Sequence, residues 1–95
     1  MTDHVLDALA HDVRQSVIKS LTREAQQNLD DVLDDCTESF REEESLRLTL
    51  HHTHLPKLDD VGAVDYDTDD RFIERGDQFE TFERTLNSIQ AARTA

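Results

Sequence analysis

The apolar residues of this chain recur at helical spacing in most segments and switch to alternation in one. In the first segment, residues 3–21, they return every three or four positions. The series runs as follows: Leu6, Leu9, Val13, Val17 and Leu21, flanked by Val5 and Ile18. This spacing predicts one amphipathic helix. At 95 residues the chain is long enough for a single small core and too short for two.

A second, shorter helix is predicted after a break in the pattern. Residues 23–27 interrupt the helical spacing and suit a short extended segment. Asn28 then has a side chain suited to capping the start of a helix. That helix would present three apolar residues to the core: Leu29, Val32 and Leu33.

A third helix is predicted from about residue 40 to about residue 58. Ser39 and Glu42 have the spacing of a capping box, in which each side chain satisfies a backbone N–H of the first turn. Pro56 lies near the far end, where a kink or a tightened last turn is tolerable.

The remaining residues predict a hairpin and a last helix. In 59–75, Val64 and Tyr66 alternate with acids, a turn follows, and a return strand begins at Phe72. A final helix of about fifteen residues carries an apolar stripe: Phe79, Phe82, Leu86 and Ile89. Three helices followed by a hairpin is the order of a winged helix-turn-helix.

The segment that joins the third helix to the hairpin carries a family resemblance. The motif THLPKL at 53–58, followed by GAVDY at 62–66, resembles a family of small haloarchaeal winged-helix proteins presumed to regulate transcription. The resemblance covers about residues 6–75, although Arg47 and His51 stand where many relatives have apolar or aromatic residues. It implies the winged helix-turn-helix fold. Together with the element order, this predicts an α+β, mainly helical single domain, with the winged helix-turn-helix over 1–76 and an additional C-terminal dimerisation helix over 77–95.

Charge is the strongest compositional signal. The chain has 22 acids and 10 bases, a net charge of −12, and Lys19 and Lys57 are its lysines. Such a surface suits a cytoplasm with molar salt, where screening shortens to about 3 Å and self-repulsion fades. We therefore predict a halophilic, archaeal protein, the alternative being an ordinary acidic protein. Residues 41–58 are neutral, so the third helix is among the least repulsive sites for a polyanion.

Small hydroxyl side chains, a histidine and a few cations on this helix suit contacts with base edges and phosphates. The predicted DNA contacts, with one from the hairpin, are Arg41, Ser45, Arg47, Thr49, His52, Thr53, Lys57 and Arg71. The hairpin is acidic, so cations bridging carboxylates to phosphates are one way for it to approach DNA. The expected function is a sequence-specific, DNA-binding transcriptional regulator that acts on double-stranded DNA. The alternative is a winged-helix module that binds a protein partner and no DNA.

Other chemistry has weaker support. His51 and His54 share a helix face, but two histidines supply half of a tetrahedral metal shell, so we expect no metal site. His54 is expected to be a core histidine and His52 to face solvent. Cys36, the single cysteine, is expected to be buried, a redox-sensing thiol being the alternative.

No nucleophile–base pair or phosphate-binding glycine loop stands out, so neither enzyme activity nor a cofactor is predicted. No apolar run is long enough to span a membrane and no signal peptide is recognised, so a cytoplasmic location is expected.

The last helix also predicts assembly. In the sequence no element remains after the hairpin to cover its apolar stripe, and exposed phenylalanines favour a partner. We therefore predict a homodimer whose interface is formed by Phe79, Phe82, Leu86 and Ile89. The alternative is that this helix folds back on its own domain.

The charge generates a first testable prediction. Because a net charge of −12 repels itself, lowering KCl from molar to about 0.1 M, where screening reaches about 10 Å, should unfold the chain. Circular dichroism should record the loss of helical signal. An unchanged spectrum and melting temperature across that range would contradict the halophilic interpretation.

Overall fold

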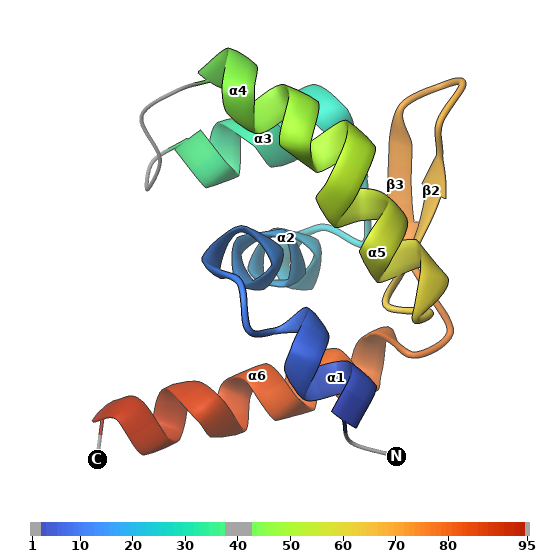
Figure 1. Cartoon of the computed structure of the whole chain (residues 1–95). Helices are drawn as coiled ribbons and strands as arrows, with labels where there is room; N and C mark the ends of the chain where they lie inside the picture. Colours follow the sequence, from blue (N-terminus) through green and yellow to red (C-terminus); the bar gives the residue numbers. More distant parts are fainter. Residues whose placement is uncertain (1–2, 38–42, 95) are drawn as a thin grey trace.

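Helices dominate the structure and one three-stranded antiparallel sheet completes it (Figure 1). The computed structural model describes residues 3–37 and 43–94. Its elements in order are α1 (Asp3–Ala8), α2 (Asp12–Arg23), β1 (Gln26–Asn28), α3 (Leu29–Thr37), α4 (Glu43–Thr49), the π-helical turn η1 (Leu50–His54), α5 (Leu55–Asp60), β2 (Val64–Asp67), β3 (Phe72–Arg75) and α6 (Phe79–Thr94). The α+β, mainly helical class is as predicted, and the element order is consistent with a winged-helix-like arrangement.

The predicted first helix is two helices, so the prediction of one continuous helix was wrong. His11 starts α2, since its Nδ1 accepts the Val13 backbone N–H at 3.2 Å. Arg14 closes the end of α1 by donating from Nε to the Ala8 carbonyl at 2.5 Å and from a terminal nitrogen to the Asp7 carbonyl at 3.3 Å. These side chains satisfy the backbone groups that a helix break exposes.

The extended segment predicted before the second helix is confirmed as β1, and it joins the hairpin. The strand order is β1-β3-β2, with Gln27 opposite Ile73 and Ile73 opposite Tyr66. These three side chains are buried, so one face of the sheet packs on the core while the acids Asp65 and Asp67 face outward.

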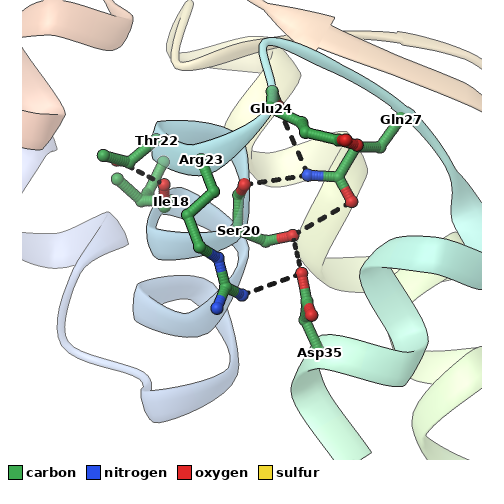
Figure 2. A network of polar contacts seen from close by, with 7 residues as sticks. All are labelled: Ile18, Ser20, Thr22, Arg23, Glu24, Gln27 and Asp35. Atoms are coloured by element: carbon green, nitrogen blue, oxygen red, sulfur yellow. Dashed lines mark hydrogen bonds and ion pairs between the residues drawn. The ribbon is translucent and has the colours of Figure 1, made fainter.

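A polar network that is buried at Ser20 and Gln27 and reaches the surface at Arg23 joins α2, β1 and α3 (Figure 2). The Ser20 hydroxyl donates to Asp35 Oδ2 at 2.5 Å, and Gln27 Oε1 lies 3.2 Å from the same hydroxyl oxygen. The Gln27 amide donates back to the Ser20 carbonyl at 2.8 Å, and Arg23 pairs with Asp35 at 2.9 Å. The network satisfies the polar groups that the contact between α2 and α3 buries, and it holds the two helices in register.

The predicted cap at the start of α3 is confirmed, because Asn28 Oδ1 accepts the Asp31 backbone N–H at 2.9 Å. The predicted capping box of Ser39 and Glu42 lies outside the described residues.

The predicted third helix is one rod built from α4, η1 and α5 (Figure 1). At about 3.6 residues per turn, an ideal α-helix would place Leu55 opposite Leu46 and would place Lys57 directly above Leu46, in the core. The structure has the reverse, since Leu55 is fully buried and the Lys57 side chain is 41% exposed. The wider turn η1 lies between these positions and absorbs the excess residues.

Pro56 explains why the wide turn lies here. A proline donates no backbone hydrogen bond, and its ring presses on the carbonyl of the residue four positions earlier. In η1 the Leu55 N–H reaches the Leu50 carbonyl, five residues back, which opens the helix before the proline. Pro56 predicted a kink or a tightened last turn, and the structure instead has a wider turn just before it.

The premise of the predicted dimer interface was wrong. Phe79, Phe82 and Leu86 are buried within the single chain, and Ile89 packs against the same core. α6 crosses beneath α1 and α2, which cover its stripe (Figure 1). The apolar face at the start of the chain was already large enough to cover the last helix, and the sequence pattern does not reveal that pairing. The dimer itself stays a prediction.

The two glycines of the chain meet where the hairpin base enters α6. Gly62 has a positive φ of 81°, and its carbonyl accepts the Gln78 N–H at 2.8 Å. A Cβ on Gly76 would collide with the Gly62 carbonyl oxygen and would lie 2.9 Å from the Val64 nitrogen. Both obstacles are backbone atoms, so they cannot turn aside as a flexible side chain would.

Substituting Gly76→Ala should therefore destabilise the fold. We expect the free energy of unfolding to fall by about 1–3 kcal/mol, the usual cost of overpacking. Urea denaturation in molar KCl measures this, with the exposed neighbour Asp77→Ala as the matched control. Equal urea midpoints for the two variants would contradict the prediction, because they would show that the turn accommodates a Cβ at residue 76.

Candidate nucleic-acid interface

One face of the α4–η1–α5 helix carries half of the eight predicted DNA contacts. Four of them are exposed on it: Ser45, Thr49, His52 and Thr53. On the opposite side His54 is buried, so the predicted burial of His54 and exposure of His52 are confirmed. Arg41 lies outside the described residues.

The Thr49 hydroxyl is already engaged within the helix. It donates to the Ser45 carbonyl at 2.5 Å, a local bond that threonine often makes in helices. Thr49 therefore presents an oxygen acceptor and a methyl group outward, and it presents no free proton. This bond narrows the contacts that Thr49 can make with a base.

Of the three phosphate contacts predicted on this helix, the two that the structure describes, Arg47 and Lys57, form surface ion pairs. Arg47 pairs with Asp30 at the start of α3, and Lys57 Nζ lies 2.9 Å from Asp7 Oδ2 of α1. All four side chains are at least one-third exposed. Exposed pairs of this kind stabilise a fold by about 0–1 kcal/mol, so an incoming anion can replace the carboxylate at little cost.

The hairpin places an arginine beside the helix. Asp67 Oδ1 accepts the N–H groups of Asp69 and Asp70 at 3.0 and 3.2 Å, which shapes an acidic turn. Arg71 follows with a positive φ of 54°, and its carbonyl accepts the Leu29 N–H at 2.8 Å. This bond ties the end of the turn to the first residue of α3.

A surface pocket of about 270 Å³ gathers three of the predicted contacts. Its lining residues are Leu29, Arg47, Leu48, His51, His52 and Arg71. We call this the arginine–histidine pocket. Arg47, His52 and Arg71 were predicted, whereas Leu29, Leu48 and His51 were not. Ser45, Thr49, Thr53 and Lys57 are not among its lining residues.

His51 is half-buried, and its Nδ1 lies 2.6 Å from the Tyr66 hydroxyl of β2. Its place beside the hairpin depends on Tyr66, fifteen residues further along the chain, and helical periodicity does not report such a contact.

A family model matches residues 6–74, from α1 to β3, which span the whole candidate interface. The chain belongs to the DUF7344 family. That family is described as a domain of unknown function, so the resemblance to haloarchaeal regulators stays a prediction. No curated protein and no solved structure matches the chain. The last helix, α6, lies beyond the residues that match the family model.

A buried cluster supports the α4–η1–α5 helix from the side opposite its exposed face. An Arg14 terminal nitrogen lies 3.5 Å from His54 Nδ1, and the rings of His11 and His54 are 4.4 Å apart. Because arginine can only donate, Nδ1 of His54 is the acceptor. Burial, then the charges of His11 and Arg14, lower the pKa of His54 from its ordinary 6.5 to about 4. His54 is therefore neutral at pH 7.

Among the residues that the structure describes, the metal-ligating side chains do not cluster and the thiol of Cys36 is buried. Within residues 3–37 and 43–94, no three histidine, cysteine or carboxylate side chains gather as a metal site would require. Burial, followed by the charge of Asp35, raises the pKa of the Cys36 thiol to about 12. A thiol so protonated is a poor nucleophile, which disfavours a redox-sensing role. No described helix is both long and apolar enough to cross a bilayer.

The neutral His54 makes the stability of the DUF7344 domain depend on pH. Below pH 6.5 the unfolded chain takes up a proton that the folded chain refuses until about pH 4. The free energy of unfolding is therefore unaffected by this histidine above pH 6.5, and it decreases as the pH falls from 6.5 toward 4. The loss should amount to roughly 3 kcal/mol, measured by urea denaturation across this range in molar KCl.

His54→Gln should flatten this part of the pH dependence, since glutamine does not titrate. The matched control is His52→Gln, because His52 is exposed on the same helix. Parallel pH profiles for the wild type and His54→Gln would contradict the assignment.

Proposed function

We propose that this chain is a winged helix-turn-helix protein that binds double-stranded DNA and regulates transcription in a halophilic archaeon. The observation that carries the proposal is the arginine–histidine pocket, where the exposed helix face meets the hairpin. Arg47 and His52 come there from the helix, and Arg71 comes from the turn of the hairpin. Basic and hydrogen-bonding groups arranged beside an exposed helix suit a nucleic-acid contact.

In the proposed complex the α4–η1–α5 helix enters the major groove, which is about 12 Å wide and admits a helix. Ser45, His52 and Thr53 then face base edges, while Thr49 accepts a bond or packs its methyl group. Leu48, which is 60% exposed, suits contact with a thymine methyl group. Arg47 and Lys57 exchange their carboxylate partners for phosphates, and Arg71 of the hairpin supplies a further cation.

The acidic turn of the hairpin sets the conditions for binding. Asp67, Asp69 and Asp70 are exposed beside Arg71, so phosphate is repelled unless salt screens them or bound cations bridge the two. Ordinary DNA binding weakens with salt, because it releases counterions. Binding that takes up bridging cations would instead strengthen as salt rises.

We also propose that the protein binds DNA as a dimer, and the argument for the dimer comes from the spacing of the DNA grooves. Two interface helices spaced about 34 Å apart would occupy successive major grooves of a dyad-symmetric site. The side chains of Phe79, Phe82 and Leu86 hold the single chain together, so a Phe82→Glu variant would unfold the protein and would not test this.

The second candidate is a protein-interaction module without DNA binding. Two observations favour it: the net charge of −12, and the carboxylate partners that Arg47 and Lys57 already have. Under this alternative the same exposed face binds another protein.

Fluorescence anisotropy in molar KCl separates the candidates, with duplexes from the region upstream of the gene and light scattering for the mass. Replacing Thr49 and His52 together by alanine should weaken specific binding by at least about 2 kcal/mol, since two base contacts are lost and each contributes about 1–3 kcal/mol. Lys57→Ala should weaken all sequences alike.

The matched control is the double alanine variant of Asn87 and Ser88, both exposed on α6. If no duplex binds above background at any salt concentration, or if the Thr49 and His52 pair proves neutral, the interaction module becomes the better account.

A further inference from the structure

The arginine–histidine pocket differs in charge from other hollows of the surface. Its six lining residues include two arginines and two histidines and no acid. Four other surface hollows each include at least one carboxylate, and the one between α2 and α3 is lined by Asp31, Asp34 and Asp35 among others. On a chain of net charge −12, an acid-free hollow stands out as a place where an anion can approach.

The same pocket also has an apolar wall. Leu48 is 60% exposed, and Leu29 lines the pocket from the start of α3. In molar salt the attraction between exposed charges is screened within a few ångström, about 3 Å, whereas covering apolar surface is not weakened in this way. A ligand with both an anionic group and an apolar body would use both kinds of contact.

Its walls are held in place by the fold. The Tyr66 hydroxyl contacts His51 at 2.6 Å, and the Arg71 carbonyl accepts the Leu29 N–H at 2.8 Å. Arg47 is oriented by Asp30, whose side chain is 71% exposed. Because that pair is open to solvent, a ligand carboxylate can take the place of Asp30 on the guanidinium.

We propose that this pocket binds a small amphipathic carboxylate, with the carboxylate on Arg47 and Arg71 and the apolar body against Leu48. The volume of about 270 Å³ suits one ring or a short chain, being slightly below the range of sites for drug-sized ligands. The proposal stands whether or not the chain binds DNA. If it does, the ligand occupies Arg47, His52 and Arg71 and competes with DNA.

The test is NMR of the histidine rings in molar KCl with benzoate as the probe and no DNA present. Benzoate should shift the ring signals of His51 and His52 and leave those of the buried His54 in place. Benzamide lacks the charge and inorganic phosphate lacks the apolar body. Each should bind at least tenfold more weakly than benzoate, about the affinity that one charge-assisted contact contributes.

Four variants make the test specific. Arg71→Gln and Leu48→Ser should each weaken benzoate binding, the first about tenfold because it removes a charge-assisted hydrogen bond. Asp30→Asn should tighten binding, since it removes a carboxylate that competes for Arg47. Arg84→Gln, which removes an equal charge from an exposed pair on α6, should change nothing.

Three results would overturn the proposal. These are the absence of shifts at His51 and His52, phosphate binding as tight as benzoate binding, or equal weakening by Arg84→Gln and Arg71→Gln. Tight phosphate binding would assign the pocket to a simple phosphate contact.

Discussion

The α4–η1–α5 helix must bury Leu46, Leu50, Leu55 and Leu58 on one side, and the candidate interface depends on how it does so. A regular α-helix would have directed Lys57 into the core and Leu55 into solvent. The π turn before Pro56 corrects this phase. With the phase corrected, Lys57 reaches Asp7 of α1, and α5 ends where Asp59 accepts the backbone N–H of Tyr66 in β2 at 2.8 Å. The same turn therefore sets both the exposed face of the helix and the position of the hairpin beside it.

Two arginines of this acidic chain bind the carbonyl ends of helices inside the fold, and two others line a surface pocket. Arg14 is buried and closes α1 through the Ala8 and Asp7 carbonyls, while Arg75 donates to the Leu21 and Thr22 carbonyls and so closes α2. Arg75 also stacks on the Phe79 ring, with 5.0 Å between the guanidinium carbon and the ring centre, which links the hairpin to α6. These arginines complement the negative ends of helices. Arg47 and Arg71 instead lie at the surface and line the arginine–histidine pocket.

Local patterns predicted those features that depend on neighbours in the sequence. The Asn28 cap, the extended segment before it, the alternating strand at Val64 and Tyr66, and the opposite environments of His52 and His54 all follow from spacing over a few residues. The division of the first helix was missed because Leu9 and Val13 continue the apolar spacing across the break, while the side chains that make the break, His11 and Arg14, act through hydrogen bonds. The cover on α6 was missed because it comes from residues more than fifty positions earlier.

By itself, the sequence determined that this chain forms a small, acidic, mainly helical domain with one hairpin, because periodicity, capping and charge are properties of neighbouring residues. It also selected the helix face with Ser45, Thr49, His52 and Thr53, since that face is what remains once the leucines are buried. Only the tertiary structure decided that Arg47, His51 and Arg71 share one pocket and that Arg47 and Lys57 have acidic partners. Those contacts join the α4–η1–α5 helix to α1, to α3 and to the hairpin. Packing places these elements side by side, and no spacing along the chain encodes the distances between them.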